Sequence, residues 1–329
     1  MRMFRVIEPG PFTTIQDLGR FGFQQFGVPV SGALDRSSFR AANLLVGNPG
    51  NSAVLESTFM GPKLEALAEG IVAVCGADVP IALNDRPQAA WESFSVRPGD
   101  TIGIRAARSG VRSYLAVAGG IDVPEVMGSR STCVGGKFGG LEGRTLVKGD
   151  VLSRGQAALG RHNLTIPLQF RPSFRGSMIL RAIPGPQDDY FDRGMDLFFT
   201  SEFTVSTQAD RMGCRLDGPV IALKDGVPRS ILSEPSLSGV VQVPADGRPI
   251  ILFGEQTAGG YAKIATVISA DLDLAAQARP GDRIRFDRCD LARAHALYAG
   301  YQAKLPAAVP VPAAAPGSRS VQRPADECS

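Results

Sequence analysis

Three stretches of the chain place polar side chains among glycines, a composition expected where the backbone must approach a ligand closely. The first stretch, 10–48, contains Gln16, Asp17, Arg20 and Asp35. Its carboxylates could transfer protons, and its guanidinium could bind an anion. The same residues could equally form turn and cap hydrogen bonds, with Asp35 capping a helix.

The second stretch combines an arginine with hydroxyl groups, because Ser129, Arg130, Ser131 and Thr132 follow one another directly. A guanidinium presents a planar fork of donors that suits a carboxylate or a phosphate. Ser129, Arg130 and Ser131 are therefore candidate anion-binding residues. An arginine that only satisfies loop carbonyls explains the pattern equally well.

The third stretch, 242–261, is a strand-like run that leads into a loop of small and polar residues. Amide, hydroxyl and phenol groups on such a loop could orient an amide or ureido substrate and stabilise a developing oxyanion. The candidate residues are Gln242, Glu255, Gln256, Thr257, Gly259, Gly260 and Tyr261.

Several catalytic signatures are missing from the sequence. No G-x-S-x-G elbow occurs, and neither His162 nor His295 lies near a serine-rich turn, which argues against a Ser-His-Asp hydrolase. The glycine-rich stretch 135–140 lacks the G-K-[ST] ending of a phosphate-binding loop and is better explained as a hairpin loop. No dinucleotide-binding motif is present, and without a His/Cys cluster no metal site is expected.

The composition is that of a globular protein, with 44% hydrophobic residues, 20% charged residues and a net charge of +3. Arg and Lys are scattered, so we expect no nucleic-acid partner. No signal-peptide pattern and no run of 18 apolar residues occurs, so we expect neither secretion nor a membrane span. Five widely spaced cysteines without a C-x-x-C motif indicate reduced thiols and a cytoplasmic protein.

Short runs rich in Val, Ile, Leu and Phe recur between Gly, Pro, Asn and Asp, which predicts a mainly β fold. Their spacing favours barrels or sandwiches over a doubly wound parallel sheet. Helices are predicted at 37–46, 271–278 and 290–304. An Arg-Pro-Gly-Asp turn occurs at both 97–100 and 279–282, which is compatible with two related β-barrel lobes.

The predicted organisation is a first β subdomain over 1–152, a polar crossover segment over 153–175 and a second β subdomain over 176–304. The remaining residues, 305–329, are rich in Pro and Ala and end in charged residues. They contain too little bulky apolar surface to fold, which predicts a disordered tail.

Together, these stretches resemble the allophanate hydrolase subunit 2 family, also called the 5-oxoprolinase C subunit family, KipA-like or the second half of a biotin-dependent carboxyltransferase domain. The resemblance runs in order from about Val6 to Phe286. It is carried by the strings TTIQDLGRFGFQQFGVPVSGALD, AANLLVGN, LEST, RSYLAVAGGIDVPEVMGSRST, GPQDDYF, DRMGCRL, VQVPADGRPIIL, QTAGGY and AQARPGDRIRF.

The resemblance implies a cyclophilin-like β-barrel architecture in two subdomains with a few short helices. It implies an ATP-dependent 5-oxoprolinase complex that converts 5-oxo-L-proline to L-glutamate. This complex would be formed with a protein like the 5-oxoprolinase B subunit and with a LamB-like A subunit. ATP is expected to bind to the complex, and the site need not lie on this chain.

The resemblance, combined with residue type, also implies roles for the candidates. Amide-orienting roles fall to Gln16, Gln256, Thr257 and Tyr261. Proton transfer falls to Asp17, Asp35 or Glu255. Neutralisation of anionic charge falls to Arg20, Arg130 and Arg211, with Arg215 as a further anion-binding candidate.

Two other functions remain open at the level of the sequence. Relatives fused into urea carboxylase move a carboxyl group from carboxybiotin to urea, so the chain could be a biotin-dependent carboxyltransferase with biotin on a separate carrier. It could also be a regulatory protein that sequesters a kinase inhibitor. Family members often carry Asp where this chain has Gly254, and usually Thr where it has Ala258. Glu255 could supply the missing carboxylate, or the local chemistry could differ, so the exact substrate stays open.

Overall fold

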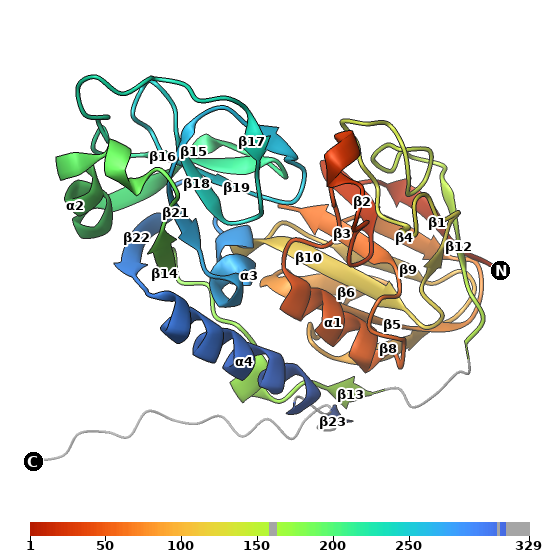
Figure 1. The fold of residues 1–329 in the computed structure, drawn as a ribbon. Helices are drawn as coiled ribbons and strands as arrows, with labels where there is room; N and C mark the ends of the chain where they lie inside the picture. Colours follow the sequence, from red (N-terminus) through yellow and green to blue (C-terminus); the bar gives the residue numbers. More distant parts are fainter. Residues whose placement is uncertain (158–162, 308–309, 314–329) are drawn as a thin grey trace, which may run out of the picture.

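The computed structural model describes residues 1–157, 163–307 and 310–313. They form two β units that pack side by side along a seam, one N-terminal and one C-terminal (Figure 1). The mainly β fold expected from the sequence is confirmed. Within the described residues, no helix is long and apolar enough to cross a membrane.

The N-terminal unit is a sandwich of two antiparallel sheets. The seven-stranded sheet has the order β11-β12-β1-β4-β9-β6-β7, with bounds β1 Arg2–Glu8, β4 Lys63–Ala66, β6 Ile81–Leu83, β7 Arg86–Gln88, β9 Thr101–Ile104, β11 Ile121–Asp122 and β12 Val151–Arg154. The five-stranded sheet has the order β2-β3-β10-β5-β8, with bounds β2 Phe12–Gln16, β3 Val54–Thr58, β5 Gly70–Asp78, β8 Ser93–Val96 and β10 Ser109–Val117. Apolar side chains from both sheets form the core between them.

The five-stranded sheet is buried on both faces. In β5, Val72 and Val74 face the other sheet, whereas Ala73 and Cys75 pack beneath helix α1 (Arg36–Leu45). This division follows from the two-residue period of a strand, and burial on both sides explains why β5 reads as a continuous apolar run.

The C-terminal unit is a closed barrel in the order β14-β21-β18-β19-β16-β15-β22. The strands are β14 Ser177–Pro184, β15 Glu202–Ala209, β16 Gly213–Asp217, β18 Val240–Val243, β19 Ile250–Leu252, β21 Ala262–Val267 and β22 Arg283–Arg288. One parallel pair, β14 with β22, closes the barrel. Helix α2 (Asp192–Thr200) contributes Phe198, which stacks on Phe286 at 4.3 Å between ring centroids. This helix was not predicted from the sequence.

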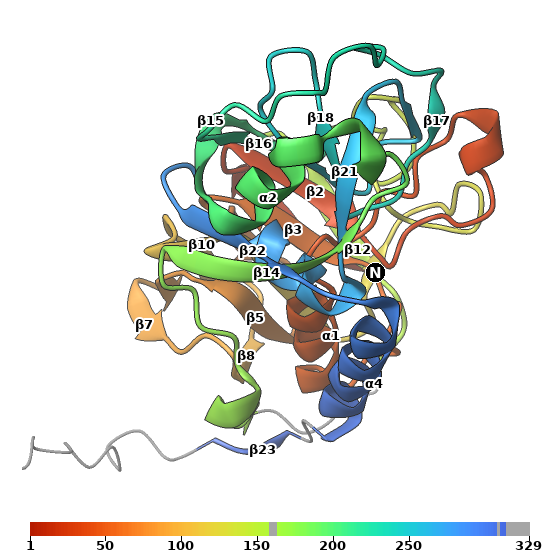
Figure 2. The same ribbon diagram turned by 60° about the vertical axis from the view of Figure 1, so that its left-hand side comes forward.

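The three helices predicted from the sequence are present as α1, α3 (Leu272–Ala276) and α4 (Leu291–Ala307). Helix α4 follows the last barrel strand and contacts α1, so it spans from one unit to the other (Figures 1 and 2). Single 3-10 turns occur at η1 Gln24–Phe26, η2 Leu168–Phe170, η3 Asp188–Tyr190 and η4 Ser269–Asp271.

Two small strand pairs lie outside the main sheets. Strand β17 (Glu234–Pro235) pairs with β20 (Ala258–Gly259), and β13 (Leu164–Thr165) pairs with β23 (Val311–Pro312). Order therefore continues past position 305, where the tail was expected to begin. Residues 314–329 lie outside the described residues, and for them a disordered tail stays a prediction.

The repeated Pro-Gly-Asp turn adopts the same geometry in both units. The Asp100 carboxylate accepts a hydrogen bond from the Arg97 N–H at 2.7 Å, and the Asp282 carboxylate accepts one from the Arg279 N–H at 3.0 Å. Gly99 has a φ of 88° and Gly281 of 92°, which explains the glycine. The surrounding folds differ, because one unit is a two-sheet sandwich and the other a closed barrel, so the motif marks similar turns.

Candidate functional site

The first two candidate stretches meet in a buried cluster around Asp17. Its Oδ1 accepts hydrogen bonds from the hydroxyls of Ser129 and Ser131, each at 2.6 Å, and from the Gly19 N–H at 2.8 Å. Its Oδ2 accepts one from the Arg130 N–H at 2.7 Å. These bonds join two loops that lie more than 110 positions apart in the sequence. A role for Asp17 in proton transfer stays a prediction.

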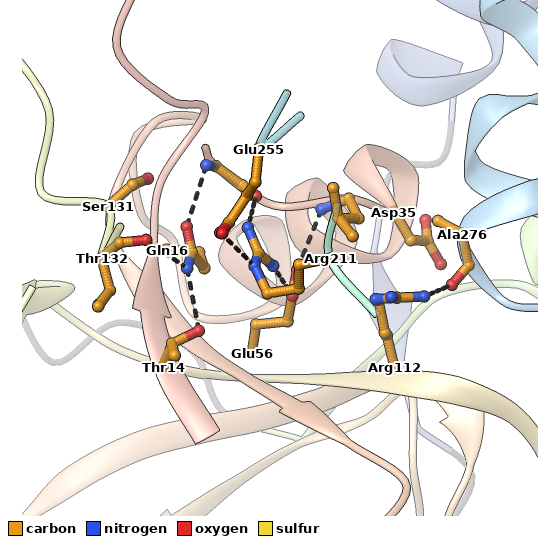
Figure 3. A network of polar contacts seen from close by, with 12 residues as sticks. Thr14, Gln16, Asp35, Glu56, Arg112, Ser131, Thr132, Arg211, Glu255 and Ala276 are labelled. Carbon is orange, nitrogen blue, oxygen red and sulfur yellow. Dashed lines mark hydrogen bonds and ion pairs between the residues drawn. The ribbon is translucent and has the colours of Figure 1, made fainter. Parts of the chain in front are cut away.

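Gln16 connects three segments from inside the same region. Its Nε2 donates to the Thr14 hydroxyl at 2.9 Å and to the Thr132 carbonyl at 3.2 Å. Its Oε1 accepts from the Gly32 N–H at 3.0 Å (Figure 3). The carboxamide is fully buried, and its role in orienting an amide stays a prediction.

Arg20 is the largest fully buried side chain of the cluster. It donates through Nη2 to the Ser131 carbonyl and lies over the Phe138 ring, 4.8 Å from its centroid. Its Nη1 has no hydrogen-bond partner among the described residues. Burial lowers the pKa of the guanidinium.

The glycine-rich hairpin 135–140 packs against this cluster. A Cβ at Gly139 would lie 2.1 Å from the Ser131 carbonyl oxygen, and one at Gly140 would lie 1.9 Å from the Thr132 hydroxyl. The Gly140 N–H donates to the Arg130 carbonyl at 3.1 Å. The glycines are therefore explained by close packing.

Arg130 itself points toward the surface. Its Nη1 pairs with Glu125 Oε1 at 2.6 Å, and its Nε donates to the Val123 carbonyl at 3.1 Å. Its guanidinium is thus engaged by neighbouring residues of the same loop.

Arg211, which follows β15, joins the barrel to the sandwich. Its Nη1 pairs with the buried Glu56 of β3, and its Nε donates to Glu255 Oε1 at 2.7 Å (Figure 3). Its Nη2 donates to the Gly32 carbonyl at 2.7 Å. Burial opposes the charge of Arg211, but the two carboxylates outweigh it and hold its pKa above the ordinary value.

Asp35 caps α1, as expected, and also contacts the barrel unit. It accepts hydrogen bonds from the N–H and hydroxyl of Ser38, at 2.9 and 2.6 Å, and from Gln277 Nε2 at 2.7 Å. Burial raises the pKa of Asp35 to about 6, and the nearby charge of Asp273 adds to the shift. Gln277 Oε1 in turn accepts from the Arg112 N–H at 2.8 Å.

The third candidate stretch lines a pocket of about 320 Å³ beside β18 and β19, the barrel pocket. It gathers six of the predicted residues: Arg215, Gln242, Gln256, Gly259, Gly260 and Tyr261. Gln242 is 4% exposed, and its Nε2 has no hydrogen-bond partner among the described residues. An unsatisfied buried amide is costly, so this group is suited to bind a ligand.

Gly259 permits this position of Gln242. A Cβ at residue 259 would lie 2.2 Å from Gln242 Nε2. The Arg215 guanidinium is held by Asp246 Oδ2 at 2.7 Å, and Tyr261 is 41% exposed. Carboxamides, a phenol and a guanidinium thus share one pocket, a set that can hold a planar amide.

Two other predicted residues do not line the barrel pocket. Glu255 turns toward Arg211, and Thr257 contributes its carbonyl, which accepts from the Ser236 N–H at 3.0 Å. Gly254 lies against the first unit, where its carbonyl accepts from the Ser31 N–H at 2.9 Å. The Glu255 carboxylate is therefore committed to an ion pair.

Two lining residues of the barrel pocket with polar side chains were missed, Gln208 and Asp210. Asp210 precedes Arg211, and its carboxylate accepts from the Met212 N–H at 2.7 Å. Its place at the start of the DRMGCRL string was the only signal that could have identified it. Among the described residues, no group of three His, Cys, Asp or Glu side chains could hold a metal ion.

Comparison with known proteins agrees with this fold. Residues 26–288 match the family described as carboxyltransferase domain, subdomain A and B. This chain belongs to that carboxyltransferase domain family. The resemblance found in the sequence is thereby confirmed.

This carboxyltransferase domain chain is 42% identical to the 5-oxoprolinase C subunit of Escherichia coli (strain K12) over 296 residues, which covers 89% of this chain and 93% of the relative. It is 36% identical to the urea amidolyase of Lachancea kluyveri, over 86% of this chain and 17% of the relative. The crystal structure of K. lactis urea amidolyase superposes with a TM-score of 0.87 at 33% identity, covering 92% of this chain. This chain therefore corresponds to only 20% of the length of the K. lactis protein.

Proposed function

We propose that this chain is the C subunit of an ATP-dependent 5-oxoprolinase complex and that its barrel pocket binds the ring amide of 5-oxo-L-proline. The match to the E. coli C subunit supports this proposal because it covers 93% of that relative's length. The observation that carries the assignment of the site is the buried side-chain Nε2 of Gln242, which has no hydrogen-bond partner among the described residues.

The chemistry of the pocket suits a lactam. The substrate carbonyl accepts from Gln242 Nε2, the ring N–H donates to a carboxamide oxygen such as that of Gln256, and the carboxylate pairs with Arg215. Neutral donors fixed around the carbonyl oxygen stabilise negative charge as it develops there, without reorganisation of water.

The proposed reaction needs activation because an amide is a poor electrophile. The γ-phosphoryl group of ATP transfers to the lactam oxygen, releasing ADP, and water then adds to the activated carbon. The ring C–N bond breaks as the nitrogen takes a proton, and a second water converts the acyl phosphate to glutamate and phosphate. We assign ATP binding to one of the two expected partners, the B-type or the LamB-like protein, since the sequence of this chain lacks a phosphate-binding loop.

Co-expression with its partner genes tests the proposal. Purified complex should form glutamate and ADP in equal amounts from 5-oxoproline and ATP, and omission of this chain should abolish glutamate. Gln242→Ala should lower kcat/KM by about 100-fold, the effect of losing one oxyanion donor. Asp217→Ala is the matched control because Asp217 forms a surface ion pair with Arg248 on the same barrel. Full activity in Gln242→Ala, or in Gln256→Ala combined with Tyr261→Phe, would contradict the site.

A second candidate function is biotin-dependent carboxyl transfer to a urea-like amide, favoured by the TM-score of 0.87 with urea amidolyase. It requires a biotinylated carrier protein. A well-formed complex that produces no glutamate, yet carboxylates urea when that carrier is added, would favour this function over the first.

A further inference from the structure

A second pocket, of about 280 Å³, lies along the seam between the two units, and we call it the seam pocket. Its walls come from the loop 30–34, helix α1, the barrel loop 253–256 and helix α4. It shares only Gln256 with the barrel pocket. Because both units and α4 build it, the pocket exists only in the assembled fold.

Two arginines on one face of α1 line the seam pocket. Arg36 and Arg40 are four positions apart, one helical turn, so their side chains lie next to each other. Within the described part of the chain, no carboxylate oxygen lies within 4.0 Å of the guanidinium nitrogens of either residue. Arg36 lies over the Phe21 ring, 5.9 Å from its centroid.

The acidic group in the wall forms no ion pair with the guanidinium of either arginine. Asp273 Oδ1 accepts from the Arg36 backbone N–H at 2.8 Å, and Oδ2 accepts from the Ser37 N–H at 3.1 Å and from the Tyr301 hydroxyl at 2.6 Å. Its oxygens are thus engaged by α1 and α4. Asp273 is the only carboxylate among the lining residues, so the lining carries a net charge of +1 when both arginines are counted.

A buried hydroxyl is a second, independent indication of a ligand. Ser31 is 3% exposed, has a φ of 55° and lines the seam pocket. Its Oγ has no hydrogen-bond partner among the described residues. Its backbone is fixed by the bond from its N–H to the Gly254 carbonyl, so the hydroxyl is held where a bound group could satisfy it.

The remaining lining completes a site for a small polar molecule. Gln24 and Gln256 bring carboxamides, and Phe21, Leu34 and Phe253 bring apolar surface. Each planar guanidinium can form two hydrogen bonds to the oxygens of a carboxylate or a phosphate. We propose that the seam pocket binds a small organic anion, whose carboxylate or phosphate pairs with Arg36 and Arg40 and whose polar remainder meets Ser31 and the carboxamides.

Titration calorimetry on the full purified chain tests this proposal, with inorganic phosphate, succinate and the neutral amide succinamide as probes. We expect at least one anion to bind, succinamide to bind at least about tenfold more weakly, and affinity to fall as salt is added. Preference for phosphate or for succinate identifies the anionic group. Failure of both anions to bind would overturn the proposal.

Variants locate the binding. Arg40→Gln should weaken the preferred anion by about tenfold or more, the usual effect of losing one charge-assisted hydrogen bond. Arg40→Lys should lose less because the charge remains. Arg248→Gln, which removes a guanidinium paired with Asp217 on the barrel surface, is the matched control and should bind the anion as the unaltered chain does. Equal affinity in Arg40→Gln and the unaltered chain would place the anion elsewhere and refute the site.

A second variant tests the proposal even if Arg40→Gln does not fold. Gly254→Asp adds a carboxylate to the same wall, and its Cβ would lie 3.0 Å from the Ser31 carbonyl oxygen and 3.8 Å from Leu34. Gly254→Ala introduces the Cβ without charge. Anion binding that survives in Ala but is lost in Asp supports the proposal, and binding retained in both contradicts it. The result is independent of amide turnover by the complex.

Discussion

At the residue scale, two carboxylates that look catalytic in the sequence bind structural partners. Asp17 accepts four hydrogen bonds from two loops, and Asp35 accepts from a helix start and from Gln277 of the other unit. Residue type and nearby glycines indicate that such side chains have a specific role in the protein. They do not predict their partners, because the partners of Asp17 in the second loop lie 112 to 114 positions away.

Replacing Asp17 should destabilise the fold strongly. Asp17→Ala leaves several buried donors without an acceptor, so we expect the free energy of unfolding in urea to fall by at least about 3 kcal/mol. Asp17→Asn retains one acceptor oxygen and should lose less. A loss below about 1 kcal/mol in Asp17→Ala would show that the loops are held by other contacts.

Asp35 should make stability depend on pH. Its pKa rises from 3.8 in the unfolded chain to about 6 in the fold, so between about pH 4 and 6 the folded state keeps a proton that the unfolded state releases. The free energy of unfolding therefore falls as pH rises through this window and levels off above it. The lowered pKa values of Asp150 and Glu234 act in the opposite direction, raising the free energy of unfolding as pH rises toward their ordinary values of 3.8 and 4.5, so Glu234 opposes the Asp35 slope in the lower part of the window.

The variant Asp35→Asn checks the origin of this slope. It keeps a capping oxygen for α1 but cannot ionise. Urea unfolding curves at pH 4, 5, 6 and 7 should show the decline in the unaltered chain and a flatter profile in the variant. An unchanged slope would assign the effect to another group.

At the element scale, local signals identified the helices and strands that carry strong periodicity or caps. Helix α1 has an apolar stripe and Asp35 as its cap, and β5 is a continuous apolar run. Helix α2 was missed because it contains Gly194 and the adjacent Phe198 and Phe199, which are weaker helix formers than alanine or leucine. The closure of the barrel by the parallel pair β14 and β22 was not predictable, because about 100 residues separate the paired positions.

The β17–β20 pair should determine the position of the Gln242 carboxamide in the barrel pocket. Gly259→Ala places a Cβ within 2.2 Å of Gln242 Nε2, so the carboxamide must move and the kcat/KM of the complex should fall about tenfold or more. Gly135→Ala is the control, since no atom lies within 4 Å of a Cβ at that position, outside the barrel pocket. Equal activity in both variants would separate Gln242 from the reaction.

At the scale of the whole molecule, the seam is held by polar contacts between the units. Arg211 connects Glu56 of the sandwich with Glu255 of the barrel loop (Figure 3). Arg112 donates to the Asp210 carbonyl at 3.1 Å. The sequence predicted two β units, but Arg211 was identified only as an anion ligand. The reason is that a guanidinium suits an internal carboxylate as well as a bound one.

Removing Arg211 should loosen the seam. Arg211→Met leaves two carboxylates without their cation, one fully buried, and should lower the free energy of unfolding by about 3–5 kcal/mol. Adding Glu56→Gln and Glu255→Gln should restore part of the loss, since no uncompensated charge remains. Destabilisation that grows with each added substitution would contradict the ion-pair explanation. Denaturant unfolding, monitored by the fluorescence of Trp91, measures the free energy of unfolding of the single, double and triple variants.

The four described cysteines are buried in different parts of the fold. Cys75 lies beneath α1, Cys133 beside the glycine-rich hairpin, Cys214 in the barrel core and Cys289 at the base of α4. Burial raises the pKa of Cys75 well above its ordinary value and that of Cys214 to about 12, so neither forms a reactive thiolate while its surroundings stay closed. Alkylation followed by peptide mass spectrometry therefore times the opening of each region separately. The buried cysteines thus act as built-in reporters of local unfolding, and the order in which they become alkylated shows which unit opens first.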